Sequence, residues 1–537
     1  MVEIQHLSNW EDIRSAHRWD LPPNYNLAED MVGKWAKSEP DRLALLHLRE
    51  DHAQDLTFGQ LDKLSNKLAN ILVAQGLKAG DRVAVLLPQC PETLLTHLAA
   101  YKMGAIVVPL FTLFGADGLS YRIDHSGARM LVTDRANLPK LQEIEAGLEA
   151  IFCIDGAGPR ATDLRGEMEK ARDTFERVAT TPETPAFISY TSGTTGPPKG
   201  ALHAHRVLLG HVPGVQLVHD FFPKENAAMW TPADWAWMGG LCNIAMPCLR
   251  FGVPLLSHRM ERFDPEEAFE ILQNFMLTNV FLPPTALKLM RQVEKPERFD
   301  LSLRTVGSGG ESLGAEMLDW GREVLGLTIN EFYGQTECNV VLGNCASIME
   351  VRPGSMGKAV PGSDVAIIDE AGRVLPPGEA GEIAIGRRDA AMFLEYWQDP
   401  ERTEEKFRGE WMLTGDEGVM DEEGYVFFQS RTDDVITSSG YRIGPTEIEH
   451  CLTGHPAVEM AAVIGVPDPV RTEIIKAFVT LGSGRNGDPD LEKELIAHVR
   501  TRLSPHVAPR EVVFIDRMPV TATGKIMRRE LRAQTGD

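Results

Sequence analysis

Residues 56–110 alternate between two kinds of pattern: they read LTFGQLDKLSNKLANILVAQGL (56–77), RVAVLLP (82–88), PETLLTHLAAYKMG (91–104) and AIVVPL (105–110). In the first segment, leucines from Leu61 to Leu72 recur near the spacing of one helical face. The apolar runs Val83–Pro88 and Ala105–Phe111 have the composition of strands that are buried on both faces. Helices that alternate with such strands predict an α/β fold with a parallel sheet covered by helices.

The pattern changes in the second half of the chain. Residues 365–385 read VAIIDEAGRVLPPGEAGEIAI, which predicts short strands joined by Gly and Pro turns in a small antiparallel part. Residues 434–537 carry 13 basic and 14 acidic side chains and have strand and helix patterns of their own. We therefore expect a large N-terminal domain of several subdomains, residues 1–432, and a small mobile α+β C-terminal domain, residues 433–537.

Composition excludes several classes of protein. The 537 residues are 43% hydrophobic and 24% charged, which is typical of a globular chain too long for one core. A net charge of −23 argues against a nucleic-acid partner or an anionic membrane surface. No apolar run approaches the roughly 18 residues of a membrane span. The seven cysteines form no CxxC pair and the N-terminus is too acidic for a signal peptide, so we expect a cytoplasmic protein.

A glycine- and hydroxyl-rich stretch follows the strand-like AFISY. It reads Thr191-Ser192-Gly193-Thr194-Thr195-Gly196-Pro197-Pro198-Lys199-Gly200. Glycines let the backbone direct its N–H groups at an anion, while the hydroxyls and the lysine add donors and positive charge. The pattern differs from a Walker A loop, which requires GxxxxGK[ST]. It predicts a phosphate-binding loop of another type.

Further motifs follow this loop along the chain. They are Gly309-Gly310-Glu311-Ser312, Tyr333-Gly334-Gln335-Thr336-Glu337, Thr414-Gly415-Asp416, Arg431-Thr432-Asp433-Asp434, Ser439-Gly440-Tyr441-Arg442 and Pro519-Val520-Thr521-Ala522-Thr523-Gly524-Lys525. Over nearly its whole length the chain thus resembles the adenylate-forming (AMP-binding) superfamily of acyl-CoA synthetases, nonribosomal-peptide adenylation domains and beetle luciferases. The string YGQTE and the text after it look most like medium-chain acyl-CoA synthetases, which also accept benzoate-like acids.

The resemblance implies an enzyme, an AMP-forming carboxylic acid–CoA ligase of fatty acid metabolism. Such an enzyme activates a medium-chain, branched or aromatic acid as an acyl-adenylate and then forms the CoA thioester. ATP and coenzyme A would be co-substrates, with Mg²⁺ as the metal. The first step depends on positioning and on charge stabilisation at the α-phosphate. Large enzymes of this kind often associate symmetrically, which allows a homodimer.

By the same resemblance, the motif residues serve different parts of the nucleotide. Glu311 and its neighbours would line the adenine, Tyr333 would stack on it, and Asp416 would hold the ribose. The expected catalytic residues are Lys525, Thr336 and Glu337, and Glu337 would also hold Mg²⁺. The expected ATP- and AMP-binding set is Thr191, Ser192, Gly193, Thr194, Thr195, Gly196, Lys199, Gly310, Glu311, Ser312, Tyr333, Gly334, Gln335, Thr336, Asp416, Arg431, Arg442 and Lys525.

Asp433 matches the hinge of the family. The resemblance implies that the C-terminal domain swings about it between two arrangements. In one arrangement Lys525 faces the phosphates. In the other, a loop containing Ser439 and Gly440 arrives to shape a tunnel for the pantetheine arm of CoA.

The segment WTPADWAWMGG (230–240) matches the region where the family builds its acyl pocket. The expected pocket residues are Trp235, Trp237, Met238, Gly239 and Gly334. Acetate-specific relatives carry a tryptophan at the position of Gly334, so we expect the glycine to leave the pocket open. Medium-chain relatives usually read QTETG, whereas Cys338-Asn339 follow Glu337 here. A polar amide near the pocket wall favours a branched, aromatic or heteroatom-bearing acid over a simple fatty acid.

Two alternatives stay open on the sequence alone. One is an adenylation enzyme that loads a carrier protein in trans. The other is a non-catalytic sensor of nucleotide or acyl-CoA that keeps the fold. Lys525 argues against the sensor, because a pure binding protein has no chemical use for the adenylation lysine.

Overall fold

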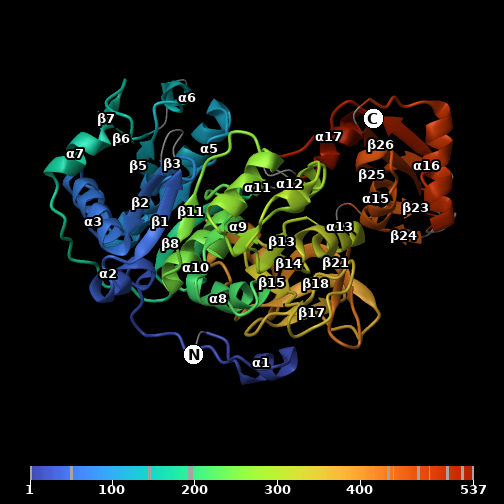
Figure 1. Cartoon of the computed structure of the whole chain (residues 1–537), viewed down its shortest axis with the longest axis horizontal. Coiled ribbons are helices and arrows are strands. Elements are labelled where there is room, and N and C mark those ends of the chain that lie inside the picture. Colours follow the sequence, from blue (N-terminus) through green and yellow to red (C-terminus); the bar gives the residue numbers. More distant parts are fainter. Residues whose placement is uncertain are drawn as a thin grey trace.

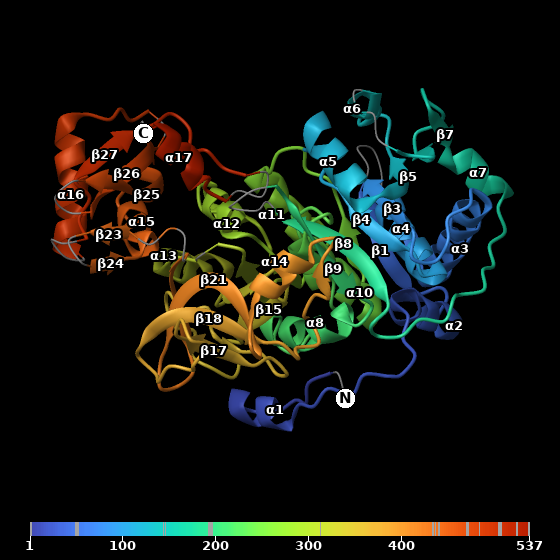
Figure 2. The same ribbon diagram turned by 180° about the vertical axis from the view of Figure 1, so that it is seen from behind.

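The computed structural model describes residues 3–48, 53–142, 144, 147–191, 197–311, 313–431, 434, 436–438, 441–468, 472–482, 484–502, 507–521 and 525–534. In Figure 1 the N-terminal elements lie toward one end of the long axis and the C-terminal elements lie at the other. The same arrangement is seen from behind in Figure 2. No helix in these ranges is both long and apolar enough to span a membrane.

The first sheet has eight strands within the described residues, in the order β19-β9-β8-β4-β3-β5-β6-β7. The strands are β3 (Arg82–Leu86), β4 (Ile106–Pro109), β5 (Ala128–Thr133), β6 (Ala150–Cys153), β7 (Ala161–Asp163), β8 (Pro185–Thr191), β9 (Lys199–Ala204) and β19 (Glu395–Tyr396). From β8 to β7 the neighbours are parallel, as the sequence predicts, while β9 and β19 extend the edge antiparallel.

The predicted helices flank this sheet and have clear ends. A capping box starts α3 (Phe58–Ala74): the Thr57 hydroxyl accepts from the Gln60 N–H, and the Gln60 side chain accepts from the Thr57 N–H. The next helix, α4 (Pro91–Met103), begins with proline at its first position. It ends at Gly104, whose φ of 71° is the left-handed conformation that glycine adopts readily.

The second sheet has nine strands in the described part of the chain, in the order β16-β15-β14-β13-β12-β10-β11-β1-β2. They are β1 (Leu43–Leu48), β2 (Ala53–Thr57), β10 (Met229–Trp230), β11 (Leu255–Ser257), β12 (Asn279–Phe281), β13 (Thr305–Gly309), β14 (Asn330–Gln335), β15 (Asn339–Gly343) and β16 (Lys358–Ala359). Its centre, from β1 to β14, is parallel, whereas β2, β15 and β16 are antiparallel to their neighbours.

One hydrophobic core joins the two sheets. It contains Val85 and Phe187 from the first sheet and Phe281 and Val340 from the second. The helix α8 (Val207–Val218) lies within this core, and all its residues are buried. The other helices outside the C-terminal part are α1 (Trp10–Ala16), α2 (Lys34–Ser38), α5 (Ala116–Ser126), α6 (Leu138–Gln142), α7 (Leu164–Lys170), α9 (Met238–Gly240), α10 (Met246–Phe251), α11 (Pro265–Asn274), α12 (Pro284–Met290), α13 (Ala315–Trp320) and α14 (Pro400–Glu405), with short η1 (Glu29–Gly33), η2 (Leu241–Ala245), η3 (Pro296–Arg298) and η4 (Gly321–Leu325).

The predicted antiparallel part follows the second sheet. Its strands are β17 (Val365–Ile368), β18 (Ala380–Gly386), β20 (Phe407–Arg408), β21 (Trp411–Met420) and β22 (Val426–Arg431), and every pairing among them is antiparallel. The long strand β21 pairs with three of the others. This position brings its middle residues to the edge of the second sheet, where β14 ends and β15 begins.

The C-terminal residues build a sheet and core of their own (Figures 1 and 2). The elements are β23 (Ile436–Ser438), β24 (Tyr441–Ile443), α15 (Pro445–Thr453), β25 (Val458–Asp468), β26 (Thr472–Leu481), α16 (Pro489–Arg502), β27 (Glu511–Phe514) and α17 (Arg528–Gln534). Arg528 ties α17 to this unit, because its guanidinium donates to both carboxylate oxygens of Glu449 at 2.7 Å. The whole chain therefore has the predicted class: parallel-rich α/β sheets, a small antiparallel part and an α+β unit at the C-terminus.

Candidate nucleotide and acid site

Three predicted motif residues meet where the end of β14 faces β21. The Tyr333 hydroxyl donates to Oδ2 of Asp416 at 2.6 Å, and Nε2 of Gln335 donates to the same oxygen at 2.7 Å. Gln335 also donates to the carbonyl of Thr414 at 2.8 Å. Asp416 is 5% exposed, and these bonds hold its carboxylate in one orientation.

Arg431 joins this group from β22. In the antiparallel pairing Asp416 lies opposite Arg431, and the guanidinium is 3.8 Å from Oδ1 of the carboxylate. Burial and then the negative charge of Asp416 raise the pKa of Tyr333 well above its ordinary value, so this hydroxyl keeps its proton and remains a donor. The structure thus brings Tyr333, Gln335, Asp416 and Arg431 together.

Glu337 lies in the turn between β14 and β15. Its carboxylate is buried, and Oε1 accepts a hydrogen bond from the Tyr396 hydroxyl at 2.5 Å. Burial alone raises the pKa of Glu337. The positive charge of Lys406 and the Tyr396 hydrogen bond outweigh burial, so the pKa lies below its ordinary value and the group is anionic at neutral pH.

The ends of the predicted phosphate loop are held by sheet pairing. Thr191 ends β8 and Lys199 begins β9, and the two residues are register partners. Ser192, Gly193, Thr194, Thr195 and Gly196, between them, lie outside the described residues. The Lys199 ammonium is 5.1 Å from the centre of the Tyr396 ring, which links this loop to Glu337.

Lys406 and Tyr396 belong to this site, although neither was expected from the sequence. Burial, and then the charges of Arg402 and Lys406, lower the pKa of Lys199, so three cations gather beside the loop. The Lys406 ammonium reaches the side chain of Gln335 and the carbonyl of Thr414 only at 3.4 and 3.5 Å. The surrounding PERTEEKF reads as a solvated, charged helix, so the sequence carries no signal for Lys406.

A second part of the site lies where β13 ends. Gly310 has a φ of 96°, and a side chain there would meet the Trp237 ring at 3.2 Å. The carboxylate of the next residue, Glu311, accepts from the Thr285 hydroxyl at 3.1 Å. Burial raises the pKa of Glu311, while the charges of Lys288 and Lys525 oppose the rise. Lys525, on the C-terminal unit, is thus close enough for its charge to act on this loop.

Several predicted residues cannot be placed. Ser312, the hinge Asp433, and Ser439 and Gly440 of the expected CoA-binding loop lie outside the described residues. The backbone of Arg442 pairs with Thr437 in the β23–β24 hairpin. The expected boundary between residues 432 and 433 also lies outside the described residues.

The predicted acyl-pocket residues occupy a layer next to a cavity without lining it. Trp235 is 1% exposed in the core, and Met238 is also buried. Gly239 lies against the rings of Trp237 and Phe281, where a Cβ would come within 3.0 Å of both. The rings of Trp237 and Phe281 are 5.8 Å apart, and those of Phe281 and Phe332 are 5.4 Å apart. An aromatic series therefore leads from Gly310 to the cavity.

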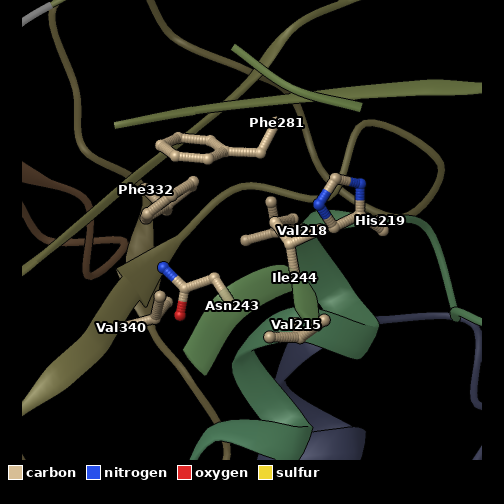
Figure 3. Close-up of a pocket in the computed structure, with 8 residues that line it drawn as sticks. All are labelled: Val215, Val218, His219, Asn243, Ile244, Phe281, Phe332 and Val340. Atoms are coloured by element: carbon tan, nitrogen blue, oxygen red, sulfur yellow. The ribbon is translucent and has the colours of Figure 1, made fainter. Parts of the chain in front are cut away.

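The cavity itself is shown in Figure 3. Its walls come from α8, η2, β12, β14 and β15, and they are formed by Val215, Val218, His219, Asn243, Ile244, Phe281, Phe332 and Val340. The space has room for about one water molecule. Half of these residues come from α8 and the η2 helix, whose largely apolar sequence reads only as core.

Gly334 lies where two backbone segments approach closely. A Cβ at this position would lie 1.4 Å from the carbonyl oxygen of Asn339, and the strand pairing is irregular between Tyr333 and Gly334. The glycine is required because the backbone of β15 approaches it, as at a β-bulge. The close approach of β15 accounts for a glycine at this position, and the expected open acyl pocket stays a prediction.

The residues present fit a magnesium ion that is shared with phosphates. Glu337 offers an anionic oxygen, since only Oε1 is engaged by Tyr396 among the described contacts. In the described ranges no cluster of three or more His, Cys, Asp or Glu side chains could hold a metal. Mg²⁺ is typically bound by one or two carboxylates together with substrate phosphates.

Comparison with known proteins agrees with this geometry. Residues 32–397 match the AMP-binding enzyme family, and residues 447–525 match the AMP-binding enzyme C-terminal domain. The mitochondrial acyl-coenzyme A synthetase ACSM3 of Mus musculus is 34% identical over 98% of this chain and 93% of its own. The acetyl-coenzyme A synthetase of Bacillus subtilis (strain 168) is 35% identical over the same shares.

A solved structure extends the comparison to the fold. The anthranilate CoA ligase AuaEII, in complex with anthranoyl-AMP, superposes with a TM-score of 0.87 at 28% identity, covering 96% of this chain and 98% of that one. The family match covers most of the chain, and the relatives align over nearly all of it. The chain belongs to the AMP-binding enzyme family.

Proposed function

We propose that this protein is an ATP-dependent, AMP-forming acid–CoA ligase that activates a medium-chain, branched or aromatic carboxylic acid. The observation that carries the proposal is the β14–β15 hairpin. Its residues bind the Asp416 carboxylate on one side and present Glu337 beside Lys199 and Lys406 on the other. Relatives named as acyl-CoA synthetases and as an anthranilate CoA ligase support the reaction class.

In the first half-reaction a carboxylate oxygen attacks the α-phosphorus of ATP, and the bond to pyrophosphate breaks. Asp416 is held by Tyr333 and Gln335, so it can accept two ribose hydroxyls without reorganising. Lys199, Arg402 and Lys406 supply positive charge for the leaving pyrophosphate, and Thr336 lies in the turn beside Glu337. Bound Mg²⁺ would be held by Glu337 and would neutralise phosphate charge.

In the second half-reaction the thiol sulfur of CoA attacks the carbonyl carbon, AMP leaves and the thiol proton passes to solvent. We propose that the C-terminal unit alternates about Asp433 between the two steps. Lys525 would then face the phosphates in the adenylation step and leave the site in the second. In the other step the Ser439–Arg442 loop would contact CoA. No acid–base triad is needed, because AMP is a good leaving group from the acyl-adenylate and a thiol is a good nucleophile.

We also propose that the protein is cytoplasmic. We propose further that it associates as a homodimer, and light scattering would test this. Six of the seven cysteines are buried, and these six are free thiols. Free thiols fit a reducing compartment. The second candidate function is an adenylation enzyme that transfers the acyl group to a carrier protein. This enzyme and the CoA ligase differ only in the acyl acceptor.

The test is pyrophosphate release from MgATP across acetate to decanoate, branched acids and benzoates, each with and without CoA. The ligase predicts a clear optimum among the larger acids and sustained turnover only when CoA is present. Equal rates of pyrophosphate release with and without CoA would favour a carrier protein as the acceptor. ATP binding without pyrophosphate release for any acid would overturn the proposal in favour of a sensor.

A further inference from the structure

The helix α5 lies beside the described ends of the predicted phosphate loop. Leu119 and Ile123 of α5 are buried in a core cluster of the first sheet, so the helix is fixed on that sheet. Tyr121 and His125 are four positions apart in α5 and therefore share one face. Their rings stack with centres 5.3 Å apart and 19° between the ring planes. The two side chains thus support each other on a fixed helix.

Tyr121 contacts the C-terminal end of the loop. Its hydroxyl donates to the carbonyl oxygen of Pro198 at 3.0 Å. Pro198 directly precedes Lys199, the first residue of β9. The hydrogen bond therefore fixes the backbone on one side of Lys199.

His125 contacts the other end of the loop through Tyr190. Nδ1 of His125 lies 2.9 Å from the Tyr190 hydroxyl. The Tyr190 ring lies against the backbone of Gly200, its register partner in β9, where an added Cβ would come within 3.3 Å of the ring. Gly200 directly follows Lys199. Helix α5 thus holds the residues on both sides of Lys199, one directly and the other through Tyr190.

Lys199 is the cation whose position depends on this arrangement. Its ammonium is 5.1 Å from the centre of the Tyr396 ring, and the Tyr396 hydroxyl donates to Glu337. A lysine side chain is long and flexible, so the region that its ammonium can reach depends on where its backbone is held. A displacement of about 1 Å is enough to weaken catalysis that depends on a positioned charge.

We infer that Tyr121 and His125 are positioning residues that, by holding the residues on either side of Lys199, direct its ammonium toward the phosphates of ATP that leave as pyrophosphate. The inference rests on the proposed function and adds two residues that act through Lys199 without touching the nucleotide. It also separates the half-reactions. Pyrophosphate leaves in the first step and is absent from the second, so Tyr121 and His125 serve adenylation and not thioester formation.

The first test is Tyr121→Phe, which removes the hydroxyl and keeps the ring. In acyl-adenylate formation, kcat/KM for MgATP should fall by about 5-fold or more, the effect of one hydrogen bond, while KM for the acid stays within about 2-fold. Thioester formation from supplied acyl-adenylate and CoA should keep the wild-type rate.

The matched control is Tyr425→Phe. It also removes a hydroxyl that donates to a backbone carbonyl, that of Glu350 at 2.7 Å. Tyr425 directly precedes the first residue of β22, at the end of the strand opposite to Arg431. This variant should keep both half-reactions at the wild-type rate.

Two further variants test whether the effect passes through Lys199. In a Lys199→Gln background, adding Tyr121→Phe should lower kcat/KM for MgATP by less than about 2-fold, because the group that Tyr121 positions is already lost. His125→Leu should slow adenylation in the same way as Tyr121→Phe. His125→Asn offers a polar atom near the position of Nδ1 and should retain most of the wild-type rate. An equal loss in the two His125 variants would remove His125 from the inference.

Three outcomes would overturn the inference. The first is an unchanged kcat/KM for MgATP in Tyr121→Phe. The second is an equal loss of both half-reactions in folded Tyr121→Phe, which would mean a general structural role. The third is the full effect of Tyr121→Phe in the Lys199→Gln background. In each case the wild-type enzyme still forms acyl-CoA, so the proposed function stands. Absence of CoA-dependent turnover by the wild-type enzyme with every acid would reject the proposed function itself and this inference with it.

Discussion

Lys406 is the cation that acts most strongly on the Glu337 carboxylate. Its charge outweighs much of the cost of burying that group and helps to lower the pKa of Glu337. We expect Lys406→Gln to lower kcat/KM for MgATP by about 10-fold or more, because one charge-assisted contact to the phosphates is lost. The acid limb of the pH–rate profile should also move to higher pH, since Glu337 then protonates more easily.

The control for this variant is Arg408→Gln, which removes a charge from the same segment. Arg408 is directed to the carbonyl of Asp369 and away from the site. It should keep both the wild-type rate and the wild-type profile. An unshifted acid limb in folded Lys406→Gln would show that Lys406 does not control Glu337.

Gly334 is held by backbone geometry. Even the methyl group of alanine would lie 1.4 Å from the Asn339 carbonyl oxygen, so β15 would have to move. We expect Gly334→Ala to lower the free energy of unfolding by about 3 kcal/mol or more, with no change in chain-length preference in the enzyme that remains folded. Gly482→Ala, where a Cβ meets nothing within 4 Å, should unfold like the wild type. A stable Gly334→Ala enzyme that favours shorter acids would contradict this reading.

For single residues, the sequence predicts those that stand in short recognisable motifs. It misses those that reach the site only because distant segments pair. Tyr333, Gln335 and Asp416 stand in recognisable strings, and the structure brings them within hydrogen-bond distance. Tyr396 and Lys406 reach the site only because β19 pairs with β9 and the following segment returns to β21. Pairing between distant segments leaves no local pattern in either of them.

Among the elements, β14 links the hydrogen-bonded group around Asp416 to the loop that follows β13. The carboxyl of Glu331, near the start of β14, accepts the N–H of Leu313 at 3.1 Å, just beyond Glu311. Burial raises the pKa of Glu331 to about 8. The strand therefore holds a protonated carboxyl at neutral pH, and that group orders the loop without adding negative charge.

This arrangement predicts a dependence of stability on pH. The pKa of Glu331 is higher in the folded protein than its ordinary value of 4.5, so folded Glu331 retains a proton that the unfolded chain loses between pH 4.5 and 8. Its contribution to stability therefore falls as pH rises through this window, by about 1.4 kcal/mol per pH unit. Glu331→Gln keeps an acceptor for Leu313 and cannot titrate.

The measurement is urea unfolding of both proteins at several pH values from 5 to 8. The stability of Glu331→Gln relative to the wild type should increase with pH, because all other groups titrate alike in the two proteins. A constant difference across the range would mean that Glu331 is ionised in the folded state.

The larger elements were predictable for a physical reason. The helices α3 and α4 and the strands β3 and β4 are specified by local periodicity, and the structure confirms them. The walls of the cavity in Figure 3 were not predictable, because α8 is buried on all sides and its sequence does not show which side borders the cavity. Which side of a buried helix borders a cavity depends on the sheet that packs against the helix.

For the molecule as a whole, we propose that the C-terminal unit decides which half-reaction the site performs. It folds around its own core, and Arg528 ties its last helix to Glu449 and Asp434 within the same unit. Lys525 directly precedes that helix region, and its charge acts on Glu311 of the larger part. A rigid unit that carries one required cation can switch a shared pocket between two reactions by moving as a body.

Because Lys525 is proposed to act in adenylation alone, Lys525→Ala should separate the two half-reactions. Acyl-adenylate formation from acid and MgATP should fall by about 100-fold or more, since a cation facing the transition-state charge is lost. Thioester formation from supplied acyl-adenylate and CoA should stay within about 3-fold of the wild type, because Lys525 has then left the site. Arg529→Ala, on α17 nearby, removes a charge from the same unit and should leave both rates unchanged. Equal loss of both half-reactions in Lys525→Ala would contradict alternation, because it would place the lysine in the site during both steps.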